Sequence, residues 1–476
     1  EDNLKIKEPI MGFAEYKTTE YPFIYENGIL KLMPPSMQAW YQEKNNLFEH
    51  LANLKKNIHS TEWTGYSNIS AKAHNGNDII FYVSNESSNN NGFISFSVIY
   101  FYEFRPSVID EKNIDGLFVT GKEVNYFYTP ARAFESKIYF KDQKLLSTSV
   151  NMKQEKEIVL GSYKYQNVDI TISIYVVPTF HSNSDTPLTA QSKMNFRFSK
   201  SQNLDFTIDV FQQCQNFFFY ICGRTNVKFD DIYVYKIINS IRNNDGIIRI
   251  TSKEIEEEKD LKRSTKIIKY EYLKEKTCLL FSAIAEDAIY LQNLCSSIQA
   301  THSFDTARII LNFVAFEREF RNLYNDDTVR SNEYDEIKNK ILQHLEILKE
   351  KNTGKKKKYV KSFINLLRKT ENKYGDRMSK ALSDCEEILL PFLRDNYKSY
   401  ETKTIEEICS RMNKLRNDSA HGNIDLQIKC IHMADFVTLE NLLYAMRLKS
   451  IGVELYDIQK SIKNLKNYNI HISEKE

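Results

Sequence analysis

An arginine and a histidine stand five positions apart in the stretch Arg416-Asn417-Asp418-Ser419-Ala420-His421. The planar guanidinium of an arginine can hold a phosphate through two parallel charge-assisted hydrogen bonds. The imidazole of a histidine can accept or donate a proton near neutral pH. RNA carries its own nucleophile, the 2′-hydroxyl, so these two groups are sufficient to cleave its backbone without a metal ion.

The spacing alone is a weak signal, and two interpretations of the motif stay open. Of the nine histidines, only His421 follows an arginine at this distance. In the structural interpretation, Arg416 pairs with a nearby carboxylate such as Asp418, and His421 caps a helix. In the chemical interpretation, Asn417 hydrogen-bonds nearby and fixes the geometry of the Arg416–His421 pair.

The segments on both sides of the motif show helical periodicity. Residues 304–324 repeat apolar side chains at three- and four-residue steps, and residues 425–449 do the same. The sequence therefore predicts a helical domain, with the motif near the start of a helical segment. The apolar positions are Ile309, Ile310, Phe313, Phe316, Phe320 and Leu323 in the first segment, and Ile428, Ile431, Met433, Phe436, Leu439, Leu442, Leu443 and Met446 in the second.

This combination resembles the HEPN superfamily (higher eukaryotes and prokaryotes nucleotide-binding). Ribonucleases of that superfamily are all-helical domains with an Arg-x(4–6)-His motif and a polar residue after the arginine, and "RNDSAH" (416–421) fits each defined position. The stretch "FVAFEREFRNLY" (313–324) is similar to the early helix of HEPN domains in ApeA-type anti-phage proteins. The resemblance covers roughly the last third of the chain.

The resemblance implies a metal-independent endoribonuclease that acts by 2′-hydroxyl transesterification, with Arg416, His421 and Asn417 as its catalytic residues. It also implies a homodimer through the HEPN domain, in which two motifs face one cleft. The setting would be abortive infection, with transfer RNA as a common target and a phage-derived trigger recognised by the N-terminal half. The alternative is a non-catalytic HEPN domain that binds nucleotide, RNA or a protein partner.

Two charged features near the motif each have two interpretations. The lysine run Lys355, Lys356, Lys357 and Lys358 is either a solvated surface or a track for RNA phosphates, which bind lysine without regard to sequence. Glu317 either pairs with Arg416 and orients it or lies at the surface beside Arg321, one helical turn on. The surface interpretation of Glu317 is favoured, and we do not expect it to be catalytic.

Composition limits the remaining possibilities. The 476 residues carry a formal net charge of +2, so no whole-protein basic surface demands nucleic acid. Seven cysteines without paired short spacing argue against a disulfide framework. Cys409, His421, Cys430 and His432 match no common zinc spacing, so we expect no metal and no cofactor. No apolar run spans a bilayer and the N-terminus lacks a signal-peptide pattern, which predicts a cytoplasmic protein without a membrane partner.

The first half of the chain is rich in strands. Short runs of Ile, Val, Phe and Tyr alternate with turn residues between about residues 65 and 250, which is typical of an antiparallel sandwich or barrel-like domain. Strands are predicted over the whole series, including "DIIFYVS" (78–84), "VNYFYTP" (124–130) and "LDFTIDVF" (204–211), with a loop at 86–91. We place a β-rich sensing or regulatory domain at 1–265 and a helical HEPN domain at 266–476.

Overall fold

The computed structural model divides into two compact units. Unit 1 comprises Glu1–Leu261 and Thr277–Ser282, and unit 2 comprises Lys262–Lys276 and Ala283–Glu476. Unit 1 first ends at residue 261, four residues before the predicted boundary at 265, and the six residues Thr277–Ser282 belong to unit 1 again. The described residues are 9–473 except 35, 37–60, 64–66, 91–92, 107–108, 142–143, 154–155, 184, 231, 252–257, 261, 325–331, 369–373, 398–399, 402 and 421–427.

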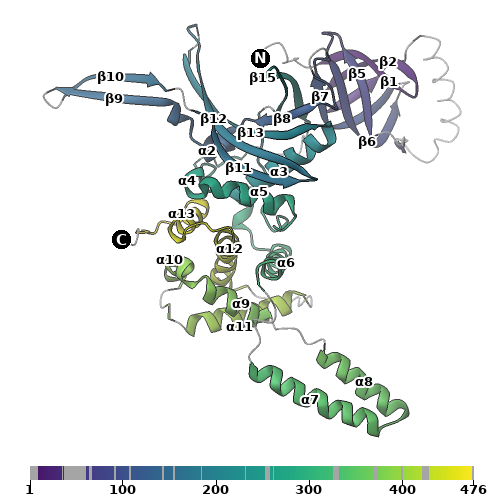
Figure 1. Cartoon of the computed structure of the whole chain (residues 1–476), viewed down its shortest axis with the longest axis vertical. Helices are drawn as coiled ribbons and strands as arrows, with labels where there is room; N and C mark the ends of the chain where they lie inside the picture. Colours follow the sequence, from purple (N-terminus) through teal and green to yellow (C-terminus); the bar gives the residue numbers. More distant parts are fainter. Residues whose placement is uncertain are drawn as a thin grey trace. The chain divides into compact units, whose positions relative to one another are not determined.

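Unit 1 contains an antiparallel barrel that closes through one shared strand (Figure 1). On one edge of β7, Phe96 lies opposite Leu30 of β3, and on the other edge Phe101 lies opposite Phe81 of β6. Apolar side chains alternate along these strands, so the inward set forms one aromatic-rich core. The barrel strands are β1 (Ile10–Tyr16), β2 (Thr19–Glu26), β3 (Ile29–Leu32), β5 (Asn68–Ala73), β6 (Asp78–Asn90) and β7 (Phe93–Phe104), with β4 (Thr61–Trp63) paired to β6.

A second part of the sheet continues from the same strand. The edge of β7 that pairs with β3 pairs further along the strand with β15, where Ile248 lies opposite Tyr102. The strands that follow β15 in the sheet are β14, β8, β13, β12 and β11, in that order. A separate two-stranded ribbon is formed by β9 and β10. These strands are β8 (Ile114–Val119), β9 (Phe134–Lys141), β10 (Lys144–Met152), β11 (Ile158–Tyr165), β12 (Val168–Phe180), β13 (Leu188–Gln202), β14 (Ile232–Ile238) and β15 (Ile241–Ile250).

Two segments predicted as strands are helices. Residues 124–130 lie mostly in α2 (Lys122–Phe127), with η2 (Pro130–Ala133) following, and residues 204–211 open α3 (Leu204–Cys222). The side chain of Asn203 caps α3 by accepting a hydrogen bond from the amide of Phe206 at 2.9 Å, and Gly223 ends it in the left-handed conformation. The strand prediction was wrong because aromatic residues such as Phe127 and Phe206, which favour strands, lie here on buried faces of helices.

The loop expected at 86–91 is also shorter than predicted. Strand β6 continues to Asn90, which lies opposite Phe93, and register shifts before Ser87 accommodate the polar residues within the ladder. The aromatic side chains of Phe101, Tyr102, Phe217 and Phe218 are buried in the core. The predicted class, an N-terminal antiparallel β domain followed by an all-α domain, is confirmed.

Unit 2 is helical. A packed group is formed by α6, α9, α10, α11, α12 and α13, whereas α7 and α8 pack mainly against each other. Helix α5 ends at Ala285, and the short helix η4 begins at Gln299. The helices of this part of the chain are α4 (Tyr270–Leu273), η3 (Lys274–Lys276), α5 (Thr277–Ala285, of which Thr277–Ser282 belong to unit 1), η4 (Gln299–His302), α6 (Thr306–Leu323), α7 (Asn332–Lys351), α8 (Gly354–Arg368), α9 (Tyr374–Asp384), α10 (Glu386–Asn396), α11 (Lys403–Ala420), α12 (Cys430–Ser450) and α13 (Leu455–Lys466).

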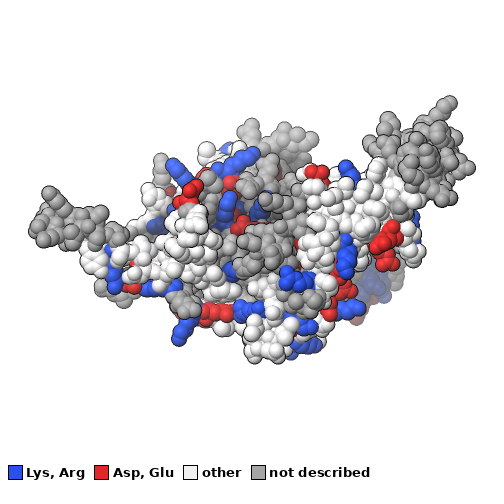
Figure 2. All heavy atoms as spheres, turned by 90° about the horizontal axis from the view of Figure 1, so that it is seen from above, with Lys and Arg blue, Asp and Glu red and all other residues white. Residues whose placement is uncertain are grey.

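The distribution of charged side chains at the surface and the hydropathy of the helices both agree with what the sequence predicts. Basic and acidic side chains are interspersed on the face shown in Figure 2, as a net charge of +2 suggests. Within the described part of the chain, no helix has the length and apolar character needed to cross a membrane.

Candidate active site

The arginine of the motif lies near the C-terminal end of a helix, just before its last turn, rather than near the start of one. Helix α11 runs from Lys403 to Ala420 and therefore contains Arg416 and Asn417. Ile405, Ile408, Met412 and Leu415 are buried at three- and four-residue steps, so the helix is already established before the motif begins. This upstream periodicity is the signal in the sequence that indicates a helix ending near the motif. His421 lies outside the described residues, directly after the end of α11.

The following helix also begins later than predicted. Residues 425–427 lie outside the described part of the chain, and α12 starts at Cys430 instead of Asp425. The ring of His432 accepts a hydrogen bond from the amide of Lys429 at 3.3 Å, which satisfies one donor at this end. Of the predicted apolar positions, Phe436, Leu439, Leu442 and Met446 are buried, whereas Ile431 and Met433 in the first turn are each 38% exposed, so the buried face begins later than predicted.

Arg416 is held by a carboxylate from a helix about a hundred residues earlier. Its Nη2 donates to Oε1 of Glu317 on α6 at 3.1 Å, and its Nη1 donates to Oδ1 of Asn417 at 3.4 Å. Oε2 of Glu317 lies 3.9 Å from Nη2 of Arg321. Both interpretations of Glu317 therefore hold together, and the preference for a surface role alone was wrong.

The pair is accessible but is backed by a buried ring. The Arg416 side chain is 40% exposed and that of Glu317 is 23% exposed, so the guanidinium can reach a ligand from solvent. Behind it, Cζ of Arg416 lies 6.0 Å from the ring centroid of Tyr374 on α9. Burial, reinforced by the negative charge of Glu317, raises the pKa of Tyr374 well above its ordinary value. Tyr374 therefore places a neutral aromatic ring against the guanidinium of Arg416.

Buried ion pairs fix the helices that carry these groups. On α11, Nε of Arg411 donates to Oδ2 of the buried Asp435 on α12 at 2.7 Å, and its Nη2 donates to Oδ1 at 2.7 Å. On α6, Glu319 pairs with Arg447 of α12 at 2.7 Å. Bidentate pairs of this kind define both distance and orientation. Both α6 and α11 are thus fixed relative to α12, and this fixes the distance between Glu317 and Arg416.

Helix α6 is anchored at its other end too, and its extent matches the prediction for 304–324. The Asp305 side chain caps it by accepting a hydrogen bond from the amide of Arg308 at 2.8 Å, and the guanidinium of Arg308 pairs with Glu440 at 2.8 Å. Ile309, Phe313, Phe316 and Phe320 are buried along one face. Glu317 follows Phe316 and so emerges beside the core.

The predicted lysine residues share one helix. Lys355, Lys356, Lys357 and Lys358 are all exposed in the first turns of α8. The structure does not bring them together with Arg416 through any contact within the described residues. A role for them in RNA binding stays a prediction.

The cysteines and histidines of the possible zinc set do not form a described cluster. Cys409 is buried on α11, and burial raises the pKa of its thiol to about 12, which disfavours the thiolate that metals bind. Cys430 is exposed at the start of α12. Among the residues that the structure describes, no three His, Cys, Asp or Glu side chains are placed to hold a metal ion.

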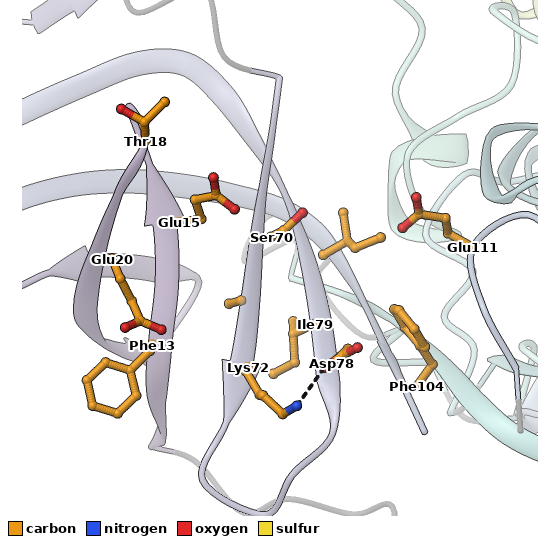
Figure 3. Close-up of a pocket in the computed structure, with 12 residues that line it drawn as sticks. Phe13, Glu15, Thr18, Glu20, Ser70, Lys72, Asp78, Ile79, Phe104 and Glu111 are labelled. Atoms are coloured by element: carbon orange, nitrogen blue, oxygen red, sulfur yellow. Dashed lines mark ion pairs between the residues drawn. The ribbon is translucent and has the colours of Figure 1, made fainter. Parts of the chain in front are cut away.

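Unit 1 contains a groove that is lined mainly by acidic side chains. It lies on the barrel, has a volume of about 450 Å³, and is lined by the carboxylates of Glu15, Glu20, Asp78 and Glu111 with one ammonium, Lys72 (Figure 3). Lys72 lies 4.0 Å from Asp78, so its charge is partly offset. Because a phosphate backbone is repelled by such a lining, the groove is a poor site for RNA.

Comparisons of the chain with known protein families, curated proteins and solved structures gave no match.

Proposed function

We propose that this chain is a metal-independent endoribonuclease that cleaves RNA by transesterification. The observation that carries the proposal is the state of Arg416. One edge of its guanidinium is held by Glu317 and the side chain is 40% exposed, and among the described residues its only other hydrogen-bond partner is Asn417. A preoriented, partly exposed guanidinium is suited to a phosphate, since its remaining donors can form charge-assisted bonds.

The reaction would use the 2′-hydroxyl of RNA as the nucleophile. His421 accepts the proton of the 2′-hydroxyl or donates one to the leaving 5′-oxygen, while the 2′-oxygen bonds to phosphorus and the bond from phosphorus to the 5′-oxygen breaks. Arg416 stabilises the charge on the pentacoordinate phosphate, and Asn417 holds Arg416 by its side-chain oxygen. The products would be a 2′,3′-cyclic phosphate and a 5′-hydroxyl.

The proposal extends to partners and setting. One histidine serves poorly as both acid and base, so a homodimer in which two motifs share a cleft would supply both roles. Exposed lysines Lys355–Lys358 would contribute contacts to RNA phosphates without regard to sequence. By its resemblance to ApeA-type proteins, the chain would act in the cytoplasm in abortive infection, with unit 1 sensing a trigger or restraining unit 2. Transfer RNA is one candidate substrate.

The test is direct. The purified full chain is incubated with total RNA in EDTA, beside variants with His421→Ala and Arg416→Lys. A folded His421→Ala protein should cleave about 10²–10⁴-fold more slowly, because proton transfer contributes that much. The lysine variant should also fail, since an ammonium cannot reproduce the planar fork.

The matched control is Lys414→Ala, which removes an exposed cation from the same helix two residues before Arg416. It should cleave like wild type. Undiminished cleavage by His421→Ala, or a strict need for a divalent ion at the chemical step, would refute the proposal. Binding of RNA by wild type without any cleavage would favour the non-catalytic alternative.

A further inference from the structure

The hairpin of α7 and α8 leaves apolar side chains exposed along both helices. Ile337, Ile341 and Leu348 of α7 recur at four- and seven-residue steps, and Tyr359, Phe363 and Leu366 of α8 recur at four- and three-residue steps. These six side chains are between 43% and 65% exposed. Each helix therefore has one continuous apolar stripe in water, which is unusual for a stable helix pair.

The two stripes lie on the same side of the hairpin. The seam between the helices is marked by the less exposed Leu342 and Leu345 of α7 and by Val360 and the buried Ile364 of α8. With 3.6 residues per turn, the apolar stripe of each helix lies about a quarter turn around the helix axis from the side that faces the other helix. The rotation has the same sense in both helices when each is viewed from its own N-terminus. In two antiparallel helices, seen side by side in Figure 1, equal displacement brings both stripes to one face.

This face is large enough to bind a partner but not large enough for a tight complex. Helices of this length extend about 25 Å, and two of them side by side present a face about 20 Å wide. Each copy would bury on the order of 500 Å², or about 1,000 Å² for two copies, near the lower limit for specific interfaces. The association should therefore depend on protein concentration.

Charge at the two ends of the face identifies the occupant. Lys355 and Lys356 stand four and three residues before Tyr359, so they extend the α8 stripe at the loop end of the hairpin. Glu333 stands four residues before Ile337 and extends the α7 stripe at the open end, and Glu336 flanks the stripe there, about 100° around the helix from Ile337. One end of the face is therefore basic and the other acidic. A second hairpin laid antiparallel on the first places each basic end against an acidic end.

We propose that two copies of this chain associate through these faces, as an antiparallel four-helix bundle related by a two-fold axis. The six apolar side chains of each copy become covered. The basic end of each copy meets the acidic end of the other, so the same contacts occur twice, as an isologous interface requires. A parallel arrangement would place lysines against lysines. The inference concerns assembly alone and holds whether or not the chain cleaves RNA.

The first experiment is sedimentation of the full chain over a wide concentration range. Wild type should pass from monomer to dimer, whereas Ile341→Glu combined with Phe363→Glu should weaken association at least about a hundredfold, because two charges would be buried. The matched control, Asn339→Glu with Asn365→Glu, adds the same charges two residues away on exposed positions outside the stripes and should behave as wild type. Circular dichroism confirms that both variants are folded.

The second experiment tests orientation without adding charge to the apolar face. Lys355→Glu with Lys356→Glu should weaken association, as should Glu333→Lys with Glu336→Lys, and a chain carrying all four changes should regain wild-type affinity. Recovery is expected only when opposite ends meet. A monomeric wild type at every concentration, dimerisation unaffected by the apolar variants, association seen only with added RNA, or no recovery in the fourfold variant would overturn the proposal.

Discussion

Arg224 in unit 1 and Arg416 in unit 2 each pair with a glutamate from a distant part of the chain. The two sites differ in how deeply the arginine is buried and in how many of its hydrogen-bond donors are used. Arg224 is 1% exposed, and its donors are taken by Glu123 at 2.8 Å and by the backbone and side-chain oxygens of Asn226 at 2.8 Å. Arg416 is 40% exposed and has one ionic contact at 3.1 Å. A buried, saturated arginine stabilises a fold, whereas an oriented and accessible one can bind an anion.

The largest effect should separate these two roles at Arg416. Arg416→Ala removes the group proposed to stabilise the charged phosphate, so cleavage should fall at least about a hundredfold. The pair is partly exposed, so the free energy of unfolding should change by no more than about 0.5 kcal/mol. Cleavage rate and denaturant unfolding are measured on the same preparation. Loss of activity accompanied by a large loss of stability would show that Arg416 is structural, like Arg224.

The fold class and the arginine of this site were predictable because their signals are local. Alternation in the first half and three- and four-residue repeats in the second identify the two domains. Helix α6 was found in the same way, since Ile309, Phe313, Phe316 and Phe320 recur on one face and are buried. Such periodicity reflects which side of each element meets a core, and that requires no knowledge of the partner.

Contacts between distant residues could not be read in this way. Glu317 pairs with Arg416 over 99 positions, and Glu123 pairs with Arg224 over 101. The second pair also explains why 124–130 is not a strand, because helix α2 turns Glu123, Val124 and Phe127 inward together. Closure of the barrel at β7 depends on pairing between strands far apart in the chain, which local pattern does not specify.

The second largest effect should fall on stability, at Arg224. Arg224→Ala leaves the carboxylate of Glu123 buried without its cation, which typically costs about 3–5 kcal/mol. The matched control is Arg242→Ala, since Arg242 forms an Arg–Glu pair with Glu157 in the same unit but is 31% exposed. Its loss should cost no more than about 1 kcal/mol. Equal destabilisation by both changes in denaturant unfolding would contradict the comparison.

A smaller effect should appear at the carboxylate that orients Arg416. Glu317→Gln keeps a hydrogen-bond acceptor but removes its charge, and neutral hydrogen bonds are roughly half as strong as charge-assisted ones. Cleavage should slow by about tenfold while stability is unchanged. Arg321→Gln is the control, because Arg321 lies 3.9 Å from the other oxygen of Glu317 and does not contact Arg416 in the described residues. An unaltered rate for Glu317→Gln would leave that residue without a positioning role.

The smallest effect concerns a glutamate that, like Glu317, faces two cations but is nearly buried. Burial opposes ionisation of Glu440, yet Lys466 and Arg308 outweigh it and lower its pKa below the ordinary value. A lowered pKa in the folded state stabilises the protein above the unfolded-state pKa of about 4.3, and this contribution is lost as the pH falls through the folded-state value. Lys466→Met should therefore cost about 1 kcal/mol at neutral pH. Denaturant unfolding at a series of pH values should show the difference from wild type shrinking below about pH 4.3, whereas Lys463→Met on the same helix should show none. A difference that does not vary with pH would mean that Lys466 acts through packing and not through the charge of Glu440.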